Sequence, residues 1–193
     1  MACDNALTTL APTCAALKKK GGFDKRFWVG SIADLTATGV TYGTDQEVTA
    51  LAFTGATGLK TYTGKRLKHG ANSTLEAGEV VNQRLQNFLP MLYAQTAAER
   101  ASLETLADAD DIFILAESNA GVIEVFGINK GSNSQFDSYG LKCSAAEWKH
   151  GVLINDDTSC AMTFTGALDN AALVFAEGTA LAANIIALDA LVV

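Results

Sequence analysis

The chain has 193 residues, of which 49% are hydrophobic and 18% are charged, and its 14 Lys and Arg against 21 Asp and Glu leave a net charge of −7. This composition excludes a chain that is disordered along its whole length, and a chain of this size can build a stable core without disulfides or metals. The acidic balance argues against general nucleic-acid binding, because phosphate backbones repel a negatively charged surface.

The first 22 residues are interpreted as an N-terminal arm, followed by a single β-rich domain over residues 23–193. The arm is apolar, but it carries Asp4 where a secretion signal has basic residues, and Lys18–Lys20 follow the apolar part. We therefore expect synthesis in the cytoplasm and a flexible joint at Leu17–Gly22. No stretch is apolar enough for a membrane-spanning helix.

Alternating, aromatic-rich residues over Lys25–Ile32 predict the first strand, and Glu47–Phe53 predicts another. The segments Leu59–Thr63 and Lys65–Ala71 flank Gly64, which predicts a hairpin with a polar, basic tip. This tip is the one concentration of positive charge in an acidic chain. Its members are Lys60, Lys65, Arg66, Lys68 and His69.

Further strands are expected at Ser73–Glu79 and within Val80–Tyr93, where Pro90 favours a strand end over a helix interior. The clearest helix signal is Thr96–Ala107. Thr96 and Glu99 form a capping box there, ahead of a run of good helix formers.

Two acidic clusters are candidate interface sites. Asp108, Asp110 and Asp111 follow the helix, and Asp156 and Asp157 form a later turn. Neither has the glycine and closing glutamate of a calcium-binding EF-hand loop. A solvated linker is therefore favoured over a calcium site for both clusters.

Two apolar, β-branched runs, Ile112–Glu117 and Val122–Gly127, surround the turn Ser118–Gly121 and predict a hairpin. Strands are also expected at Tyr139–Cys143 and Thr158–Gly166.

The C-terminal segment Ala171–Val193 is apolar, so we expect it to pack on its own body or on a neighbour. Altogether the elements amount to about seven to nine strands, with turns at intervals of about 8 to 12 residues, and one helix. The sequence thus predicts a mainly β fold, a β-sandwich or barrel with one flanking α-helix, an extended N-terminal arm and a long loop.

The sequence shows no catalytic motif and no sign of a cofactor. It lacks the G-x-S-x-G and P-loop patterns, and its four cysteines and two histidines have no metal-ligand spacing. Cys143 and Cys160 could face each other across a hairpin, but free thiols are favoured in a reducing cell. We therefore expect no catalytic, metal-binding or cofactor-binding residue.

The order of motifs over Thr96–Gly166 resembles that of structural proteins of tailed bacteriophages, in particular tail tube proteins of Bacteroidetes-type phages. The motifs are D-I-F-I-L-A-E, S-N-A-G, V-I-E-V-F-G, Y-G-L-K-C and N-D-D-T-S-C-A-M-T-F-T-G. They specify turns rather than an active site. One departure is Lys149–Gly151, which stands where that pattern has Ser-Gly before its Asp turn.

The resemblance implies a non-enzymatic virion subunit, made in the host bacterial cytoplasm, that stacks in homo-oligomeric rings with other tail proteins. An acidic lumen would let DNA pass without binding it. Within this hypothesis the basic residues of one copy contact the acidic clusters of the next, head to tail.

Two alternatives stay open. One is a different virion protein of the head, connector or decoration type. The other is a β-sandwich module that recognises carbohydrate or a cell surface, for which the candidate aromatic residues are Tyr42, Tyr62, Tyr139 and Trp148.

Overall fold

The computed structural model describes most of the chain between residue 22 and the C-terminus. The described residues are 22–44, 46–65, 68–77, 83–94, 96–129, 140–149, 158–178 and 180–193. Three of the regions discussed above lie outside the described residues. They are most of the N-terminal arm, Arg66, and the turn with Asp156 and Asp157.

The described residues form twelve strands, two α-helices and one 3-10 turn. The strands are β1 (Phe23–Ser31), β2 (Leu35–Tyr42), β3 (Glu47–Phe53), β4 (Lys60–Thr63), β5 (Gly70–Glu76), β6 (Gln83–Leu89), β7 (Met91–Tyr93), β8 (Ile112–Ser118), β9 (Ile123–Phe126), β10 (Lys142–Lys149), β11 (Ser159–Leu168) and β12 (Leu173–Phe175). The helices are α1 (Ala97–Ala107) and α2 (Leu181–Ala190), and the 3-10 turn η2 covers Ile32–Asp34.

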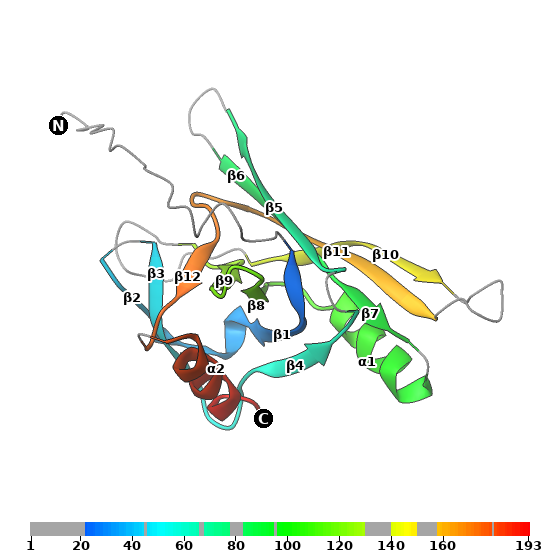
Figure 1. Ribbon diagram of the computed structural model, residues 1–193, viewed down its shortest axis with the longest axis horizontal. Helices are drawn as coiled ribbons and strands as arrows, with labels where there is room; N and C mark the ends of the chain where they lie inside the picture. Colours follow the sequence, from blue (N-terminus) through cyan, green and yellow to red (C-terminus); the bar gives the residue numbers. More distant parts are fainter. Residues whose placement is uncertain are drawn as a thin grey trace.

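The strands form two sheets (Figure 1). The seven-stranded sheet has the order β2-β3-β12-β9-β8-β1-β4, and only its β12–β3 pair is parallel. The five-stranded sheet has the order β10-β11-β6-β5, with β7 also paired to β11. The mainly β, sandwich-like fold is confirmed, although the sheets do not close into a barrel and the strands outnumber the expected seven to nine.

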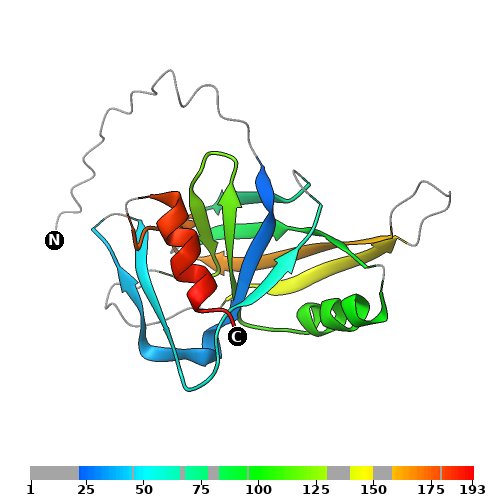
Figure 2. The ribbon, with the colours of Figure 1, turned by 60° about the horizontal axis from the view of Figure 1, so that its bottom comes forward.

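Side chains of the seven-stranded sheet pack on both of its faces. One face meets the five-stranded sheet through residues such as Phe27, Ile114 and Phe88. The other carries Trp28 and Leu115, which pack in a cluster with Leu188 of α2. Figure 2 shows α2 lying across this face. The apolar C-terminal segment therefore packs on its own body.

The capping box of α1 is confirmed. Thr96 Oγ1 accepts a hydrogen bond from the Glu99 backbone N–H at 3.1 Å, and Glu99 Oε2 accepts one from the Thr96 N–H at 2.8 Å. Leu103 and Leu106 then bury one face of the helix in the core between the sheets. The β8–β9 hairpin is also confirmed, with Leu115 opposite Val125.

The expected hairpin around Gly64 is wrong. β4 pairs with β1 and belongs to the seven-stranded sheet, whereas β5 pairs with β6 in the other sheet. Gly64 forms a bridge with Leu92, so the chain crosses here from one sheet to the other. A side chain at Gly64 would collide with the Met91 carbonyl and the His69 ring. The glycine therefore permits a close crossing rather than a hairpin turn.

No helix among the described residues is long and apolar enough to cross a membrane.

Candidate subunit interface

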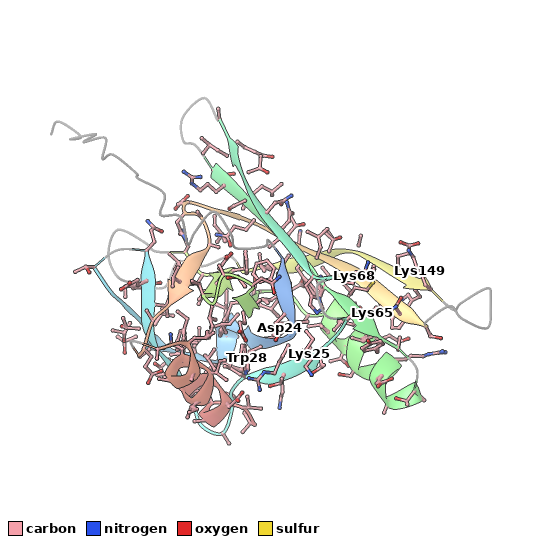
Figure 3. All side chains as sticks on the ribbon, viewed as in Figure 1. Asp24, Lys25, Trp28, Lys65, Lys68 and Lys149 are labelled. Carbon is pink, nitrogen blue, oxygen red and sulfur yellow. The ribbon has the colours of Figure 1, made fainter. Side chains whose placement is uncertain are left out.

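The predicted basic segment forms a basic patch at the crossing between the sheets. The Gly64 N–H donates to the Lys25 carbonyl oxygen at 2.8 Å, which brings β1 beside the segment. Figure 3 shows Lys25, Lys65 and Lys68 gathered in this region. Lys25 was not among the predicted interface residues, because it comes from a separate strand about forty residues earlier in the chain.

Lys60 has a separate environment from the other lysines of the segment. It lies on β4 opposite Val29, and its Nζ donates to the Val193 carbonyl oxygen at 2.9 Å. Lys60 therefore holds Val193 as well as adding charge to the surface. Lys65, by contrast, has its Nζ 5.9 Å from the centroid of the Tyr93 ring.

His69 is not part of the exposed basic surface that the sequence predicts. It is 3% exposed and lies beside the rings of Phe27 and Phe88. Its Nδ1 accepts a hydrogen bond from the Met91 N–H at 3.1 Å, which requires a neutral ring with its proton on Nε2. In that tautomer Nε2 can donate to the Lys25 carbonyl oxygen, 3.3 Å away. Burial lowers the pKa of His69. The residue belongs to the core because the chain crosses between the sheets where a hairpin tip was expected.

The first acidic cluster lies where α1 leads into β8. Asp108 is the C-cap of α1, and Asp108, Asp110 and Asp111 are all exposed. Asp111 has a left-handed backbone with φ of 52°, a conformation that Asp tolerates better than most residues do. Its carbonyl oxygen accepts from the Ile32 N–H at 2.9 Å, which fixes the turn on the end of β1.

Asp110 and Asp111 line a cavity of about 560 Å³, here called the acidic pocket. Its polar side chains also come from Gln83, Asn129, Lys142, Thr165 and Asp169. The sequence did not single out Asn129 or Asp169 for an interface. The two lie 40 residues apart, Asn129 shortly after β9 and Asp169 directly after β11, and a hydrogen bond of 2.9 Å joins their side chains.

The basic patch and the acidic pocket lie toward opposite ends of the β5–β6 pair. Lys68 precedes β5, whose first residue, Gly70, is opposite Leu89. Gln83, which lines the pocket, is opposite Glu76 at the other end of the pair. Six residue steps along a strand separate these ends by about 20 Å. At this distance the basic patch and the acidic pocket of one copy are too far apart to contact each other. The basic patch of one copy can instead contact the acidic pocket of another.

The outer strands of the five-stranded sheet are poorly covered. Five of the seven β5 side chains and six of the eight β10 side chains are exposed. Leu75 on β5 is 52% exposed. The β5–β6 and β10–β11 pairs extend from the body in different directions (Figure 1). Because β5 and β10 end the order of this sheet, each has one edge without a neighbouring strand among the described residues, and another strand could pair there.

The described candidate aromatic residues each have a partner within the chain. Tyr62 stacks on Phe27 with ring centroids 5.8 Å apart, and the Tyr42 hydroxyl donates to the Asn129 carbonyl oxygen at 3.0 Å. Trp148 is half-buried against the core between the sheets. Tyr139 lies outside the described residues.

The β10–β11 pairing places Cys143 opposite Phe164, and Cys160 opposite Trp148. Both thiols are free, and the two cysteines are not cross-strand neighbours. Burial raises the pKa of Cys160 to about 11 and also raises the pKa of Cys143. Both groups are therefore protonated and weakly reactive at neutral pH.

Comparisons of the chain with protein-family models, with curated proteins and with solved structures gave no match.

Proposed function

We propose that this chain is a non-enzymatic structural subunit that self-assembles into the tail tube of a tailed bacteriophage, as stacked rings with an acidic lumen for DNA passage. The supporting observation is the pair of uncovered outer strands, β5 and β10, on a sheet that extends from an otherwise well-packed body. Strand edges of this length expose unpaired backbone N–H and C=O groups, which promote association with other chains. Pairing with a strand of another copy would give these groups hydrogen-bond partners.

The charge distribution supports contacts between copies. The basic patch with Lys25, Lys65 and Lys68 and the acidic pocket with Asp110 and Asp111 lie on separate parts of the surface. Contact between two different surfaces of identical copies is heterologous, so it closes into rings or continues as a filament. The net charge of −7 suits a lumen that DNA crosses without binding.

The same uncovered edges suit another virion protein of the head, connector or decoration type. The shape of the assembly separates these functions, because a tube requires stacked rings and a decoration protein requires a pre-existing shell.

Sedimentation velocity over a concentration series tests self-assembly. We expect species much larger than the 20.2 kDa monomer, growing with protein concentration. The matched variants are Leu75→Lys, on the edge strand β5, and Thr57→Lys, at an exposed turn away from that edge. Leu75→Lys should reduce assembly and Thr57→Lys should not. A strict monomer at millimolar concentration would contradict the proposed function.

A further inference from the structure

The two outer strands of the five-stranded sheet point in opposite directions. Every neighbouring pair in the order β10-β11-β6-β5 is antiparallel. Three antiparallel steps separate β5 from β10, so these two strands run opposite ways. If the sheet of one copy continues into a sheet of another copy with the same orientation, β5 of the first copy meets β10 of the second as an antiparallel pair.

Each of these strands has an inner face, toward the core between the sheets, and an outer face. Ala71 on β5 is opposite Phe88, Cys143 on β10 is opposite Phe164, and both phenylalanines belong to that core. Alternation along each strand, with the register shift after Cys143, then assigns the other residues to a face. The inner-face residues are Ala71, Ser73 and Leu75 on β5, and Cys143, Ala146 and Trp148 on β10.

The faces restrict how β5 can pair with β10 of another copy. A slip of one residue would place the inner side chains of one copy on the outer face of the other, so only registers two residues apart keep the faces matched. One of these registers, with Leu75 opposite Cys143, overlaps the two strands over their whole length. It also places Ser73 opposite Ala146 and Ala71 opposite Trp148.

The charges on the outer face favour the same register. With Leu75 opposite Cys143, the next residues along the strands are Glu76 and Lys142, which are then directly opposite each other. Both side chains are exposed in the single chain. Opposite charges in a cross-strand pair stabilise it, and like charges destabilise it.

The symmetric pairings of these edges are less favourable. Full-length antiparallel pairing of β10 with a second β10 places Lys142 opposite Lys149 at both ends. The same pairing of β5 with a second β5 places Glu76 opposite Gly70, with no charge to meet it, and leaves both β10 edges unpaired. Pairing of β5 with β10 uses both edges of every copy.

We propose that the five-stranded sheet continues from copy to copy by antiparallel pairing of β5 with β10, in the register that places Leu75 opposite Cys143 and Glu76 opposite Lys142. Leu75 is 52% exposed in the single chain, and in this register it extends the apolar inner face of the neighbouring sheet. The identity of the partner as a second copy rests on the proposed function, and the register rests on the faces and charges of the two strands.

Disulfide cross-linking tests the register, because β10 supplies a native free thiol, that of Cys143. Directly opposite residues of an antiparallel pair have Cα atoms about 4.5–5.5 Å apart, within the range of a disulfide. We expect Leu75→Cys, in a background with Cys3→Ser and Cys14→Ser, to form cross-linked oligomers on mild oxidation. Mass spectrometry should identify the bond to Cys143, and adding Cys143→Ser should abolish it.

Ser73→Cys is the matched control. It lies on the same strand and face, but in the proposed register its Cα is about 8 Å from that of Cys143, too far for a disulfide. We expect no cross-link from it. A cross-link from Ser73→Cys to Cys143 would overturn the register. A cross-link from Ser73→Cys that persists with Cys143→Ser would show that β5 pairs with a second β5, because Ser73 is the midpoint of that pairing.

Charge exchange gives a second measurement that needs no cysteine. Glu76→Lys and Lys142→Glu each place like charges opposite each other, and each should raise the concentration needed for half-maximal assembly by about threefold or more. The double variant Glu76→Lys with Lys142→Glu restores opposite charges and should assemble as the parent does. Additive losses in the double variant would overturn the pairing of Glu76 with Lys142.

The outcomes separate this interface from the tail tube function. If rings or tubes form but Leu75→Cys gives no cross-link to Cys143, the interface is wrong and the proposed function stands. If Leu75→Cys cross-links to Cys143 in oligomers that form neither rings nor tubes, the interface stands and the proposed function is wrong. A protein that stays monomeric and gives no cross-link at any concentration would overturn both.

Discussion

The indole Nε1 of Trp28 donates a hydrogen bond to Oδ1 of Asp189 at 3.0 Å, which joins β1 to α2 across 161 residues of sequence. The indole is fully buried. Arg26 donates to the other carboxylate oxygen at 3.1 Å, and its guanidinium lies 4.6 Å from the centroid of the Trp28 ring. One carboxylate thus holds the last helix on the outer face of the seven-stranded sheet.

We predict that Asp189→Ala destabilises the fold by about 1–3 kcal/mol, because the buried indole N–H loses its acceptor. Asp189→Asn keeps an oxygen for the indole and should cost less. Arg26→Ala removes a partly exposed ion pair and should cost about 0.2–1 kcal/mol. Urea unfolding of the three variants measures these differences. Equal losses for Asp189→Ala and Asp189→Asn would contradict this role of the carboxylate.

The turn that carries Asp111 depends on Gly140. Gly140 has φ of +62°, and a Cβ added there would lie 2.5 Å from the Cα of Asp111. Gly55 has a similar φ of +66° with no atom within 4 Å of such a Cβ. We predict that Gly55→Ala costs about 1–2 kcal/mol from the backbone alone, and that Gly140→Ala costs clearly more. Thermal unfolding of the two variants measures the loss of stability in each. Equal losses would show that the backbone around Asp111 can move to accommodate the added Cβ at no energetic cost.

The buried His69 should make the fold sensitive to acid. Its folded pKa is lowered, chiefly by burial, with the Lys25 carbonyl and Asp24 acting in the opposite direction. Stability from the neutral ring is therefore fully present above the unfolded pKa of about 6.5 and is lost as the pH falls through the lower folded value.

The measurement is urea unfolding at about pH 7.5 and about pH 5, for the parent and for His69→Gln. The parent should lose more stability than the variant between these two values. The comparison isolates His69, because Glu117 and Glu124, whose pKa values burial raises, titrate alike in both proteins. Equal losses in the two proteins would show that His69 titrates normally.

Charge reversal of the basic patch should weaken assembly. We predict that replacing Lys65, Arg66 and Lys68 together with Glu lowers the sedimentation coefficient of the assembled protein, and that replacing all three with Gln has an intermediate effect. Single exposed pairs contribute only about 0.2–1 kcal/mol each, so the parent should also assemble less in high salt. If the Glu variant assembles as the parent does at low and high salt, the segment is a solvated surface.

The local elements of this fold follow closely from sequence. Thr96 and Glu99 specify the start of α1, because a capping box needs only residues three apart. The β8–β9 hairpin is specified in the same way by its turn and its two apolar runs. The continuous apolar run from Ile112 to Ala116 also indicates a strand whose two faces are both buried, so that other elements must pack on both sides of its sheet. One of these elements is the helix α2, which we did not predict from the sequence.

The long-range relationships could not be predicted in this way. The crossing at Gly64 resembles a hairpin locally, and only the pairing of β4 with β1 and of β5 with β6 separates the two arrangements. His69 looks like a surface cation by composition and is buried by that crossing. The acidic pocket is lined by Asp111, Asn129 and Asp169, which lie in three separate connections between strands. No sequence motif therefore predicts that they come together.

Negative-stain electron microscopy of the purified protein is the most direct test of assembly into a tail tube. We expect rings of uniform diameter, or tubes built by stacking such rings, at concentrations where sedimentation detects assembly. The triple Glu variant at Lys65, Arg66 and Lys68 should show fewer and shorter tubes on matched grids. A field of discrete particles of monomer size, at every concentration and salt condition, would contradict the proposed structural role.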